Sequence, residues 1–181
     1  EMLALPQQKL LGRDRLADDD MVVRADLTSY PYAERPSVRT LRTGVGPVIA
    51  AEAHAGLARH IERLTREAKP IARSPMEDRC LSTHIAPVAF ELGAVEELRT
   101  EVFGPVLHVV RYRHGELPQL VEAINRAGYG LTHGVQSRID ETIELIAGSI
   151  RAGNVYVNRN MIGAVVGVQP FGGEGLSGTG P

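Results

Sequence analysis

The stretch EVFGPVLHVVRY, residues 101–112, decides the fold class of this chain. Its second half, Val106–Tyr112, is β-branched and almost continuously apolar, which is typical of a strand buried on both faces of a sheet. A helix is predicted directly after it, over residues 117–127, and Gly128 stands where a helix often ends. The apolar residues on one side of that helix are Leu117, Leu120, Val121 and Ile124. A buried strand that leads into an amphipathic helix indicates an α/β protein.

The same alternation of strands and helices extends in both directions. Towards the N-terminus we expect a helix over 50–68, extended segments at 70–72 and 85–92, and one short helix within 93–100. Towards the C-terminus we expect strands at 133–137 and 154–158 on either side of a helix over 140–150. The isoleucines of that helix recur at spacings of four, three and four, as Ile139, Ile143, Ile146 and Ile150. The pattern predicts a parallel or mixed sheet flanked by helices.

Composition narrows the class of protein without naming a function. The chain has 181 residues, of which 43% are hydrophobic and 23% charged, as in an ordinary globular domain. Its net charge of -2 and its lack of Trp argue against binding to nucleic acid. No apolar run approaches the ~18–20 residues that would span a bilayer. The single cysteine, Cys80, suits a reducing compartment, so we expect a cytoplasmic protein.

Residues 1–43 differ from the rest of the chain. The acidic run Asp18-Asp19-Asp20 and the turn-rich segment SYPYAERP, residues 29–36, interrupt any long periodic pattern. We interpret this region as an irregular arm with one short helix and one short strand around Met21–Arg24, and we assign it no role. Regular structure is expected over residues 44–181.

Four segments carry the motifs that point to a chemistry. They are GVGPVI (44–49), EVFGPVLHVVRY (101–112), NRAGYGLTHGV (125–135), and GNVYVNRN (153–160) followed by QPFGGEGLSGTGP (169–181). In this order and spacing they resemble the aldehyde dehydrogenase superfamily. The last pair is similar to the L-glutamate γ-semialdehyde (delta-1-pyrroline-5-carboxylate) dehydrogenase module of proline utilization A proteins. The resemblance covers residues 36–181, and it implies that 44–181 form the C-terminal part of an aldehyde dehydrogenase catalytic domain.

The resemblance implies an NAD site at the second motif. Glu101 matches the family glutamate that accepts hydrogen bonds from the hydroxyls of the nicotinamide ribose, a task that suits an acceptor-only carboxylate. Phe103 matches an apolar wall beside the nicotinamide ring. Taken without the family, the same residues suggest a solvated carboxylate and a core phenylalanine.

The glycine-rich tail is the second implied site. In the family branch, the loop that matches GGEGLSGTG anchors the carboxylate of the aldehyde substrate. The resemblance assigns this role to the N–H groups of Leu176 and Gly178 and to the hydroxyl of Ser177, with Phe171 as a wall of the pocket. Composition alone favours the alternative of a mobile linker, whereas the strand motif just before the loop favours an ordered one.

No catalytic residue is assigned to this chain. Superfamily chemistry uses a cysteine thiolate that attacks the aldehyde, and a glutamate base that helps to hydrolyse the thioester. The nucleophile is expected before GVGPVI, whereas Cys80 follows that motif, so we interpret Cys80 as a structural or surface cysteine and not as the nucleophile. The six histidines have no metal-ligand spacing, and we expect His108 to be a packed or hydrogen-bonded core residue.

The leading hypothesis is therefore part of an NAD-dependent dehydrogenase that oxidises L-glutamate γ-semialdehyde to L-glutamate in proline breakdown. The chain would supply cofactor-ribose and substrate-carboxylate contacts, and alone it is predicted to be inactive. A non-catalytic structural or interaction module derived from an aldehyde dehydrogenase is the alternative. In either case we expect self-association or a missing N-terminal half as partner, because a partial domain exposes sheet edges and apolar faces. The third hypothesis, an unrelated α/β binding protein, is supported only by the generic alternation of strands and helices.

Overall fold

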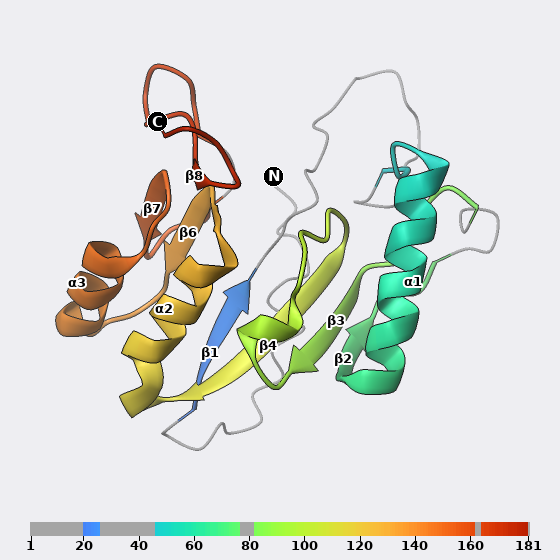
Figure 1. Ribbon diagram of the computed structural model, residues 1–181, viewed down its shortest axis with the longest axis horizontal. Helices are drawn as coiled ribbons and strands as arrows, with labels where there is room; N and C mark the ends of the chain where they lie inside the picture. The colour runs from blue at the N-terminus through green and yellow to red at the C-terminus, as the bar shows by residue number, and fades with distance from the viewer. Residues whose placement is uncertain (1–19, 26–45, 77–81, 162–163, 181) are drawn as a thin grey trace, which may run out of the picture. The chain divides into compact units, whose positions relative to one another are not determined.

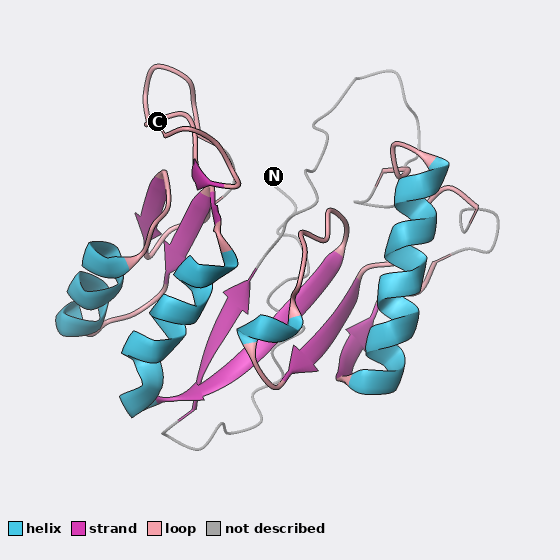
Figure 2. Ribbon diagram, viewed as in Figure 1, coloured by secondary structure: helices cyan, strands magenta, loops and turns pink. Residues whose placement is uncertain are grey.

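A computed structural model of the chain describes residues 20–25, 46–76, 82–161 and 164–180. Helices alternate with short strands throughout these ranges (Figures 1 and 2). The chain forms two compact units, and it crosses between them more than once. The first comprises Glu1–Ala94 with Val102–Arg111, and the second comprises Val95–Glu101 with Tyr112–Pro181. The boundary expected between residues 43 and 44 lies outside the described residues.

The first unit is built on a mixed sheet in the order β1-β4-β3-β2. Its strands are β1 (Asp20–Ala25), β2 (Lys69–Arg73), β3 (Val88–Leu92) and β4 (Val106–Arg113). Strands β3 and β4 are parallel, with Val88 opposite Val106, whereas β2 is antiparallel to β3. The parallel or mixed sheet expected from the sequence is thus confirmed. Strand β1 matches the short strand expected near Met21–Arg24; the short helix expected in the same arm lies outside the described residues.

Helix α1 (Ala51–Glu67) packs against this sheet through one apolar side. Its buried residues are Leu57, Ile61 and Leu64, and the sheet meets them with Phe90, Val106 and His108 among its most buried side chains. Each fully buried aliphatic or aromatic side chain contributes about 1.5–3 kcal/mol to folding. The backbone at Gly104 approaches Leu57 so closely that an added Cβ would lie 2.6 Å from its methyl carbons. Any larger residue at this position of EVFGP would have to displace the Leu57 side chain, so the packing against α1 favours glycine here.

One polar pair lies within this apolar contact. The Nε2 atoms of His60 and His108 are 2.9 Å apart, and the two rings meet edge to face with their centroids 5.1 Å apart. His108 is fully buried, and its Nδ1 has no hydrogen-bond partner among the described residues. His108 is therefore a hydrogen-bonded core residue, as expected. Its partner His60 was not foreseen, because it lies 48 positions away along the chain.

The second unit combines two helices with two small sheets. The helices are α2 (Leu117–Ala127) and α3 (Asp140–Ser149), and the 3-10 turns are η3 (Val95–Glu97) and η4 (His114–Glu116). The strands are β5 (Tyr129–Gly130), β6 (Thr132–Val135), β7 (Asn154–Val157) and β8 (Glu174–Gly175). Strands β6 and β7 pair in parallel and are joined by α3, whereas β5 and β8 pair antiparallel.

The helices of this unit agree with their predicted bounds, but not every predicted face is buried. Helix α2 ends where expected, with Gly128 in the left-handed region at φ 83°. The isoleucine stripe of α3 is only partly a core face: Ile146 is buried beside Thr142, and Ile139 is 48% exposed. The two-residue strands β5 and β8 were not predicted, since two residues show no periodicity. Within the described ranges, no helix has both the length and the apolar character to cross a bilayer.

The His60–His108 pair predicts a loss of stability in mild acid. Burial lowers the pKa of His108 from its ordinary value of 6.5 to about 4, and the charges of His60 and Arg63 act in the same direction. The unfolded chain then binds more protons than the folded chain below pH 6.5, so stability is complete above that pH and falls on acidification. We expect a loss of about 2 kcal/mol by about pH 5.

Urea denaturation followed by circular dichroism at a series of pH values measures this effect. His108→Leu removes the more deeply buried of the two imidazoles and should make the loss of stability on acidification smaller; the pKa of the half-buried His60 is also lowered by burial. His133→Leu is the matched control, because burial also lowers the pKa of His133 in the second unit and that variant should leave the contribution of His108 in place. An equally steep fall with and without His108 would contradict the assignment.

Candidate functional site

Three predicted site residues of the second unit, Glu101, Leu176 and Ser177, are hydrogen-bonded to the three-residue segment Gly128-Tyr129-Gly130. The hydroxyl of Tyr129 accepts a hydrogen bond of 3.3 Å from the backbone N–H of Glu101. Its two neighbours hold the tail: the Gly128 carbonyl accepts from the N–H of Leu176 at 2.8 Å, and the Gly130 N–H donates to Ser177 Oγ at 3.1 Å. We call this segment the hub. It ties Glu101 and the glycine-rich loop to consecutive residues.

The glycine-rich loop is folded back on itself by main-chain hydrogen bonds. Strand β8 pairs with the hub, placing Gly175 opposite Tyr129, and the N–H of Gly180 donates to the Gly173 carbonyl at 2.8 Å. Gly175 has a φ of 62°, and a Cβ on it would collide with the Gly128 carbonyl oxygen. The motif therefore needs a glycine here for both conformation and close approach.

The loop leaves fewer free donors than the motif suggests. The N–H of Leu176 is already used by the Gly128 carbonyl, while the N–H of Gly178 makes only a long 3.4 Å contact with the Gly175 carbonyl. Ser177 Oγ accepts from Gly130, which leaves its own proton free to donate. Of the three donors that the motif assigns, the Ser177 hydroxyl and the Gly178 N–H are thus the two left to bind an anion.

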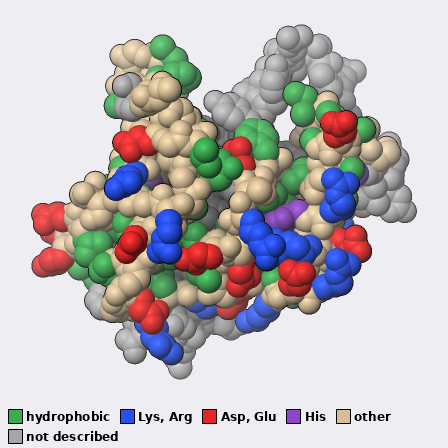
Figure 3. All heavy atoms as spheres, viewed as in Figure 1, with side chains coloured by type: hydrophobic (Ala, Val, Ile, Leu, Met, Phe, Trp, Pro, Cys, Tyr) green, Lys and Arg blue, Asp and Glu red, His purple; other side chains and the backbone are tan. Residues whose placement is uncertain are grey.

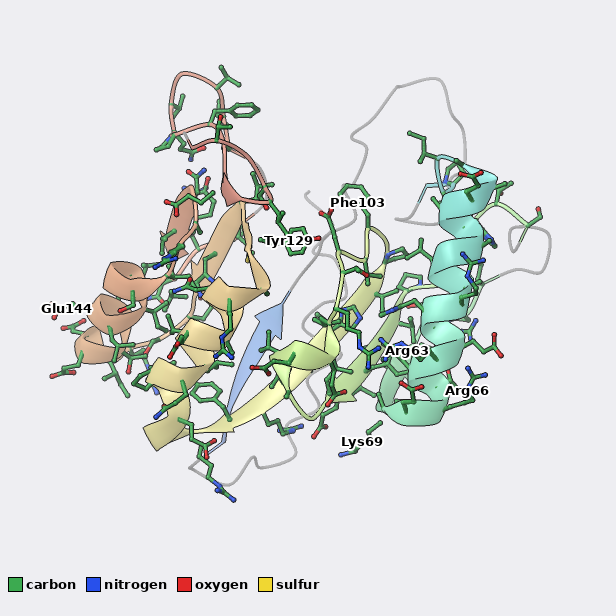
Figure 4. The ribbon with its side chains drawn as sticks, viewed as in Figure 1. Arg63, Arg66, Lys69, Phe103, Tyr129 and Glu144 are labelled. Atoms are coloured by element: carbon green, nitrogen blue, oxygen red, sulfur yellow. The ribbon has the colours of Figure 1, made fainter. Side chains whose placement is uncertain are left out.

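The apolar side chains assigned to the site are exposed. Phe171 and Leu176 are 65% and 70% exposed in the second unit, and Phe103 is 71% exposed in the first. Figure 4 labels Phe103 and Tyr129 among the side chains. A core role for Phe103, the alternative that its residue type suggests, does not fit this exposure. The carboxylate of Glu101 is also exposed, and no described residue donates a hydrogen bond to it.

Two residues that fasten the loop were missed by sequence reasoning. Tyr129 lies between the two glycines of the hub. Asn154 is buried at the start of β7, and its Nδ2 donates to the carbonyl of Pro170 at 2.8 Å, just before the loop. The sequence offered only two signals for them: Asn154 is an amide residue at the start of an apolar strand, and Tyr129 is a tyrosine between two glycines. Cys80, predicted to be a structural or surface cysteine, lies outside the described residues.

The first unit has an open hollow that none of the predicted site residues line. It measures about 540 Å³ and is lined by His54, Ala58, Ile61, Glu62, Thr65, Arg66, Arg73, His84, Ile85 and Ala86. Figure 4 labels Arg66, which lines the hollow, together with Arg63 on the same helix α1 and Lys69 at the start of β2. Their charges are largely balanced, because Arg66 pairs with Glu62 at 2.7 Å, Arg63 with Glu67 at 2.9 Å, and Lys69 with Glu91 at 3.3 Å. We assign this hollow no function.

Known proteins are similar to this chain in sequence and in fold. The model of the aldehyde dehydrogenase family matches residues 33–181. The bifunctional protein PutA of Escherichia coli (strain K12) is 55% identical over 147 residues, which is 78% of this chain and 11% of that protein. The 1-pyrroline-5-carboxylate dehydrogenase of Bacillus subtilis (strain 168) is 33% identical over 141 residues, which is 76% of this chain and 26% of that protein.

Solved structures give the same result. A crystal structure of a mutant of Bradyrhizobium japonicum proline utilization A superposes with a TM-score of 0.71 at 57% identity, over 77% of this chain and 14% of that one. The 1-pyrroline-5-carboxylate dehydrogenase from Thermus with bound NAD superposes with a TM-score of 0.64 at 37% identity, over 75% of this chain and 26% of that one. The chain thus spans only 11% to 26% of the length of these relatives.

Gly175→Ala should open the loop. The new methyl group meets the Gly128 carbonyl in a backbone conformation that alanine disfavours, so we expect the local opening free energy to fall by about 1–2 kcal/mol. Amide hydrogen exchange of Leu176 and Gly130 reports this directly. Gly167→Ala is the matched control, since Gly167 also has a positive φ, of 81°, but has open space where the Cβ would lie. Equal acceleration of exchange in both variants would argue against the close approach.

Proposed function

This chain belongs to the aldehyde dehydrogenase family, and we propose that it supplies the cofactor-ribose and substrate-carboxylate contacts of an NAD-dependent dehydrogenase acting on L-glutamate γ-semialdehyde. The observation that carries the proposal is the hub, which ties Glu101 and the Ser177 loop to three consecutive residues of one unit. The names of the relatives, PutA and 1-pyrroline-5-carboxylate dehydrogenase, support the substrate class.

The substrate contact rests on the donors that the loop leaves free. A carboxylate accepts hydrogen bonds only, and charge-assisted bonds to it are stronger than neutral ones. The Ser177 hydroxyl and the Gly178 N–H would hold it, while Gly130 fixes the orientation of the hydroxyl by donating to its oxygen. The Leu176 N–H would hold the loop in shape instead, since it is bonded to the hub.

The cofactor contact rests on Glu101. Its exposed carboxylate has no hydrogen-bond donor among the described residues, so both oxygens are available to the two hydroxyls of a ribose. The exposed ring of Phe103 offers an apolar surface of the kind that a nicotinamide ring packs against. When bound, NAD accepts the hydride that the substrate loses on oxidation. One relative, the enzyme from Thermus, has been solved with NAD bound.

A second candidate function, an interaction module without catalysis, is favoured by one observation. Large apolar side chains are exposed along the tail, namely Val165, Val166, Val168, Phe171 and Leu176. Figure 3 shows hydrophobic side chains on this part of the second unit. Exposed apolar groups of this kind often mark interaction surfaces. Concentration-dependent light scattering would support this function, and a monodisperse chain that binds NAD would oppose it.

Ser177→Ala should impair use of the semialdehyde selectively. In a complete dehydrogenase that contains this segment, loss of one hydrogen bond to a carboxylate should lower kcat/KM for L-glutamate γ-semialdehyde about tenfold. An aldehyde without a carboxylate, such as propanal, should be affected much less. Thr179→Ala removes an exposed hydroxyl two residues further on and serves as the control. Equal losses with both aldehydes would count against the carboxylate anchor.

We also predict that the 181-residue chain has no dehydrogenase activity by itself. The proposed contacts bind and orient, and Cys80 is not assigned as the nucleophile because it follows the GVGPVI motif. Absorbance of NADH with pyrroline-5-carboxylate and NAD tests this directly. NADH formation by the pure chain that Cys80→Ala abolishes would overturn the prediction.

A further inference from the structure

We propose that Tyr129 is a positioning residue that couples the two contacts of the candidate site, so that a carboxylate bound at Ser177 changes the position of the Glu101 backbone. This inference rests on the proposed function. It goes beyond that function because it assigns a role to a side chain that is itself in neither contact.

The first step of the coupling lies at Ser177. Its Oγ accepts from the Gly130 N–H at 3.1 Å, and its proton is free for a carboxylate. A hydroxyl that donates to a charged acceptor becomes a better acceptor itself, because hydrogen bonds in a chain polarise one another. Binding of a carboxylate therefore strengthens the bond from Gly130 to Ser177.

The second step passes through one peptide unit. The N–H of Gly130 belongs to the peptide plane that includes the Tyr129 carbonyl, and this plane is rigid. Further bonds hold the hub on both sides, from the N–H of Leu176 to the Gly128 carbonyl at 2.8 Å and from the N–H of Gly153 to the Gly130 carbonyl at 3.0 Å. A Cβ on Gly130 would collide with the Arg151 carbonyl oxygen, so the hub also has a close backbone neighbour. With the hub anchored at these points, the proposed response to a tighter bond at Gly130 is a small rotation of this peptide plane, which carries Tyr129 with it.

The third step is the bond from the phenol to the cofactor-side segment. Tyr129 is half-buried, and Figure 4 shows its side chain projecting away from helix α3 of its own unit. Its hydroxyl accepts from the Glu101 N–H at 3.3 Å, a long bond with room to shorten. Glu101 lies in an irregular segment after η3 and not in a strand, so no sheet hydrogen bonds resist a movement of its backbone. The carboxylate signal thus reaches the backbone that carries the ribose-binding side chain.

Nuclear magnetic resonance of the full 181-residue chain tests this coupling. Titration of the ¹⁵N-labelled chain with L-glutamate should shift the amide signals of Ser177 and Gly178, and also that of Glu101. Tyr129→Phe removes only the hydroxyl, so it should abolish the Glu101 response and keep the loop response. Tyr156→Phe is the matched control: it removes a buried hydroxyl that has no partner among the described residues, and it should keep both responses.

Each outcome decides something. A Glu101 response that persists unchanged in Tyr129→Phe, or that potassium chloride of equal ionic strength reproduces, overturns the coupling while the loop response still supports the carboxylate site. No response at Ser177 and Gly178 overturns the carboxylate site and the coupling with it. Should Tyr129→Phe misfold, hydrogen exchange in the unsubstituted chain decides instead. Glutamate should slow exchange of the Glu101 amide, and an unchanged rate at saturation overturns the coupling.

Discussion

The close approach of two glycine-bearing backbone segments is the constraint on which the candidate site depends. The hub and strand β8 come so near that a side chain on Gly175 would meet the Gly128 carbonyl, and the hub also lies against a third segment, where a side chain on Gly130 would meet the Arg151 carbonyl. Only at this distance can the N–H of Leu176 reach Gly128 and Ser177 Oγ reach the Gly130 N–H. The glycines of the tail therefore build a fixed turn, and the site's few polar groups are oriented by backbone and not by long side chains.

The hydrogen bonds of the loop distinguish the residues that hold its shape from those that remain available to bind a substrate carboxylate. Leu176 carries an N–H that a motif-based assignment offers to the substrate, yet that N–H already has a backbone acceptor. Ser177 differs because a hydroxyl can accept and donate at once. The same residue can thus hold the loop through Gly130 and still contact an anion. The serine is the natural link between the structure of the loop and its proposed chemistry.

The first unit depends on a different kind of contact, the packing of side chains between α1 and the sheet. Apolar side chains supply most of the packing between α1 and the sheet; His108 is fully buried within it, and His60 is half-buried. A neutral imidazole pair satisfies one nitrogen of each ring and leaves the buried Nδ1 of His108 without a described partner. Burial disfavours the protonated form of His108 and lowers its pKa, so the stability of this unit depends on pH.

The sequence by itself determined the alternation of strands and helices, the bounds of α2, the buried character of β4 and the family, because these follow from local periodicity and from motifs that are contiguous in the chain. It also nominated Glu101 and the Ser177 loop, and their roles stay predictions. Only the tertiary structure decided that Tyr129 contacts Glu101, that Asn154 holds the lead into the loop, and that His60 meets His108. Those pairs lie 28, 16 and 48 positions apart. Single hydrogen bonds over such separations leave no periodic signature, and they exist only once packing has brought the segments together.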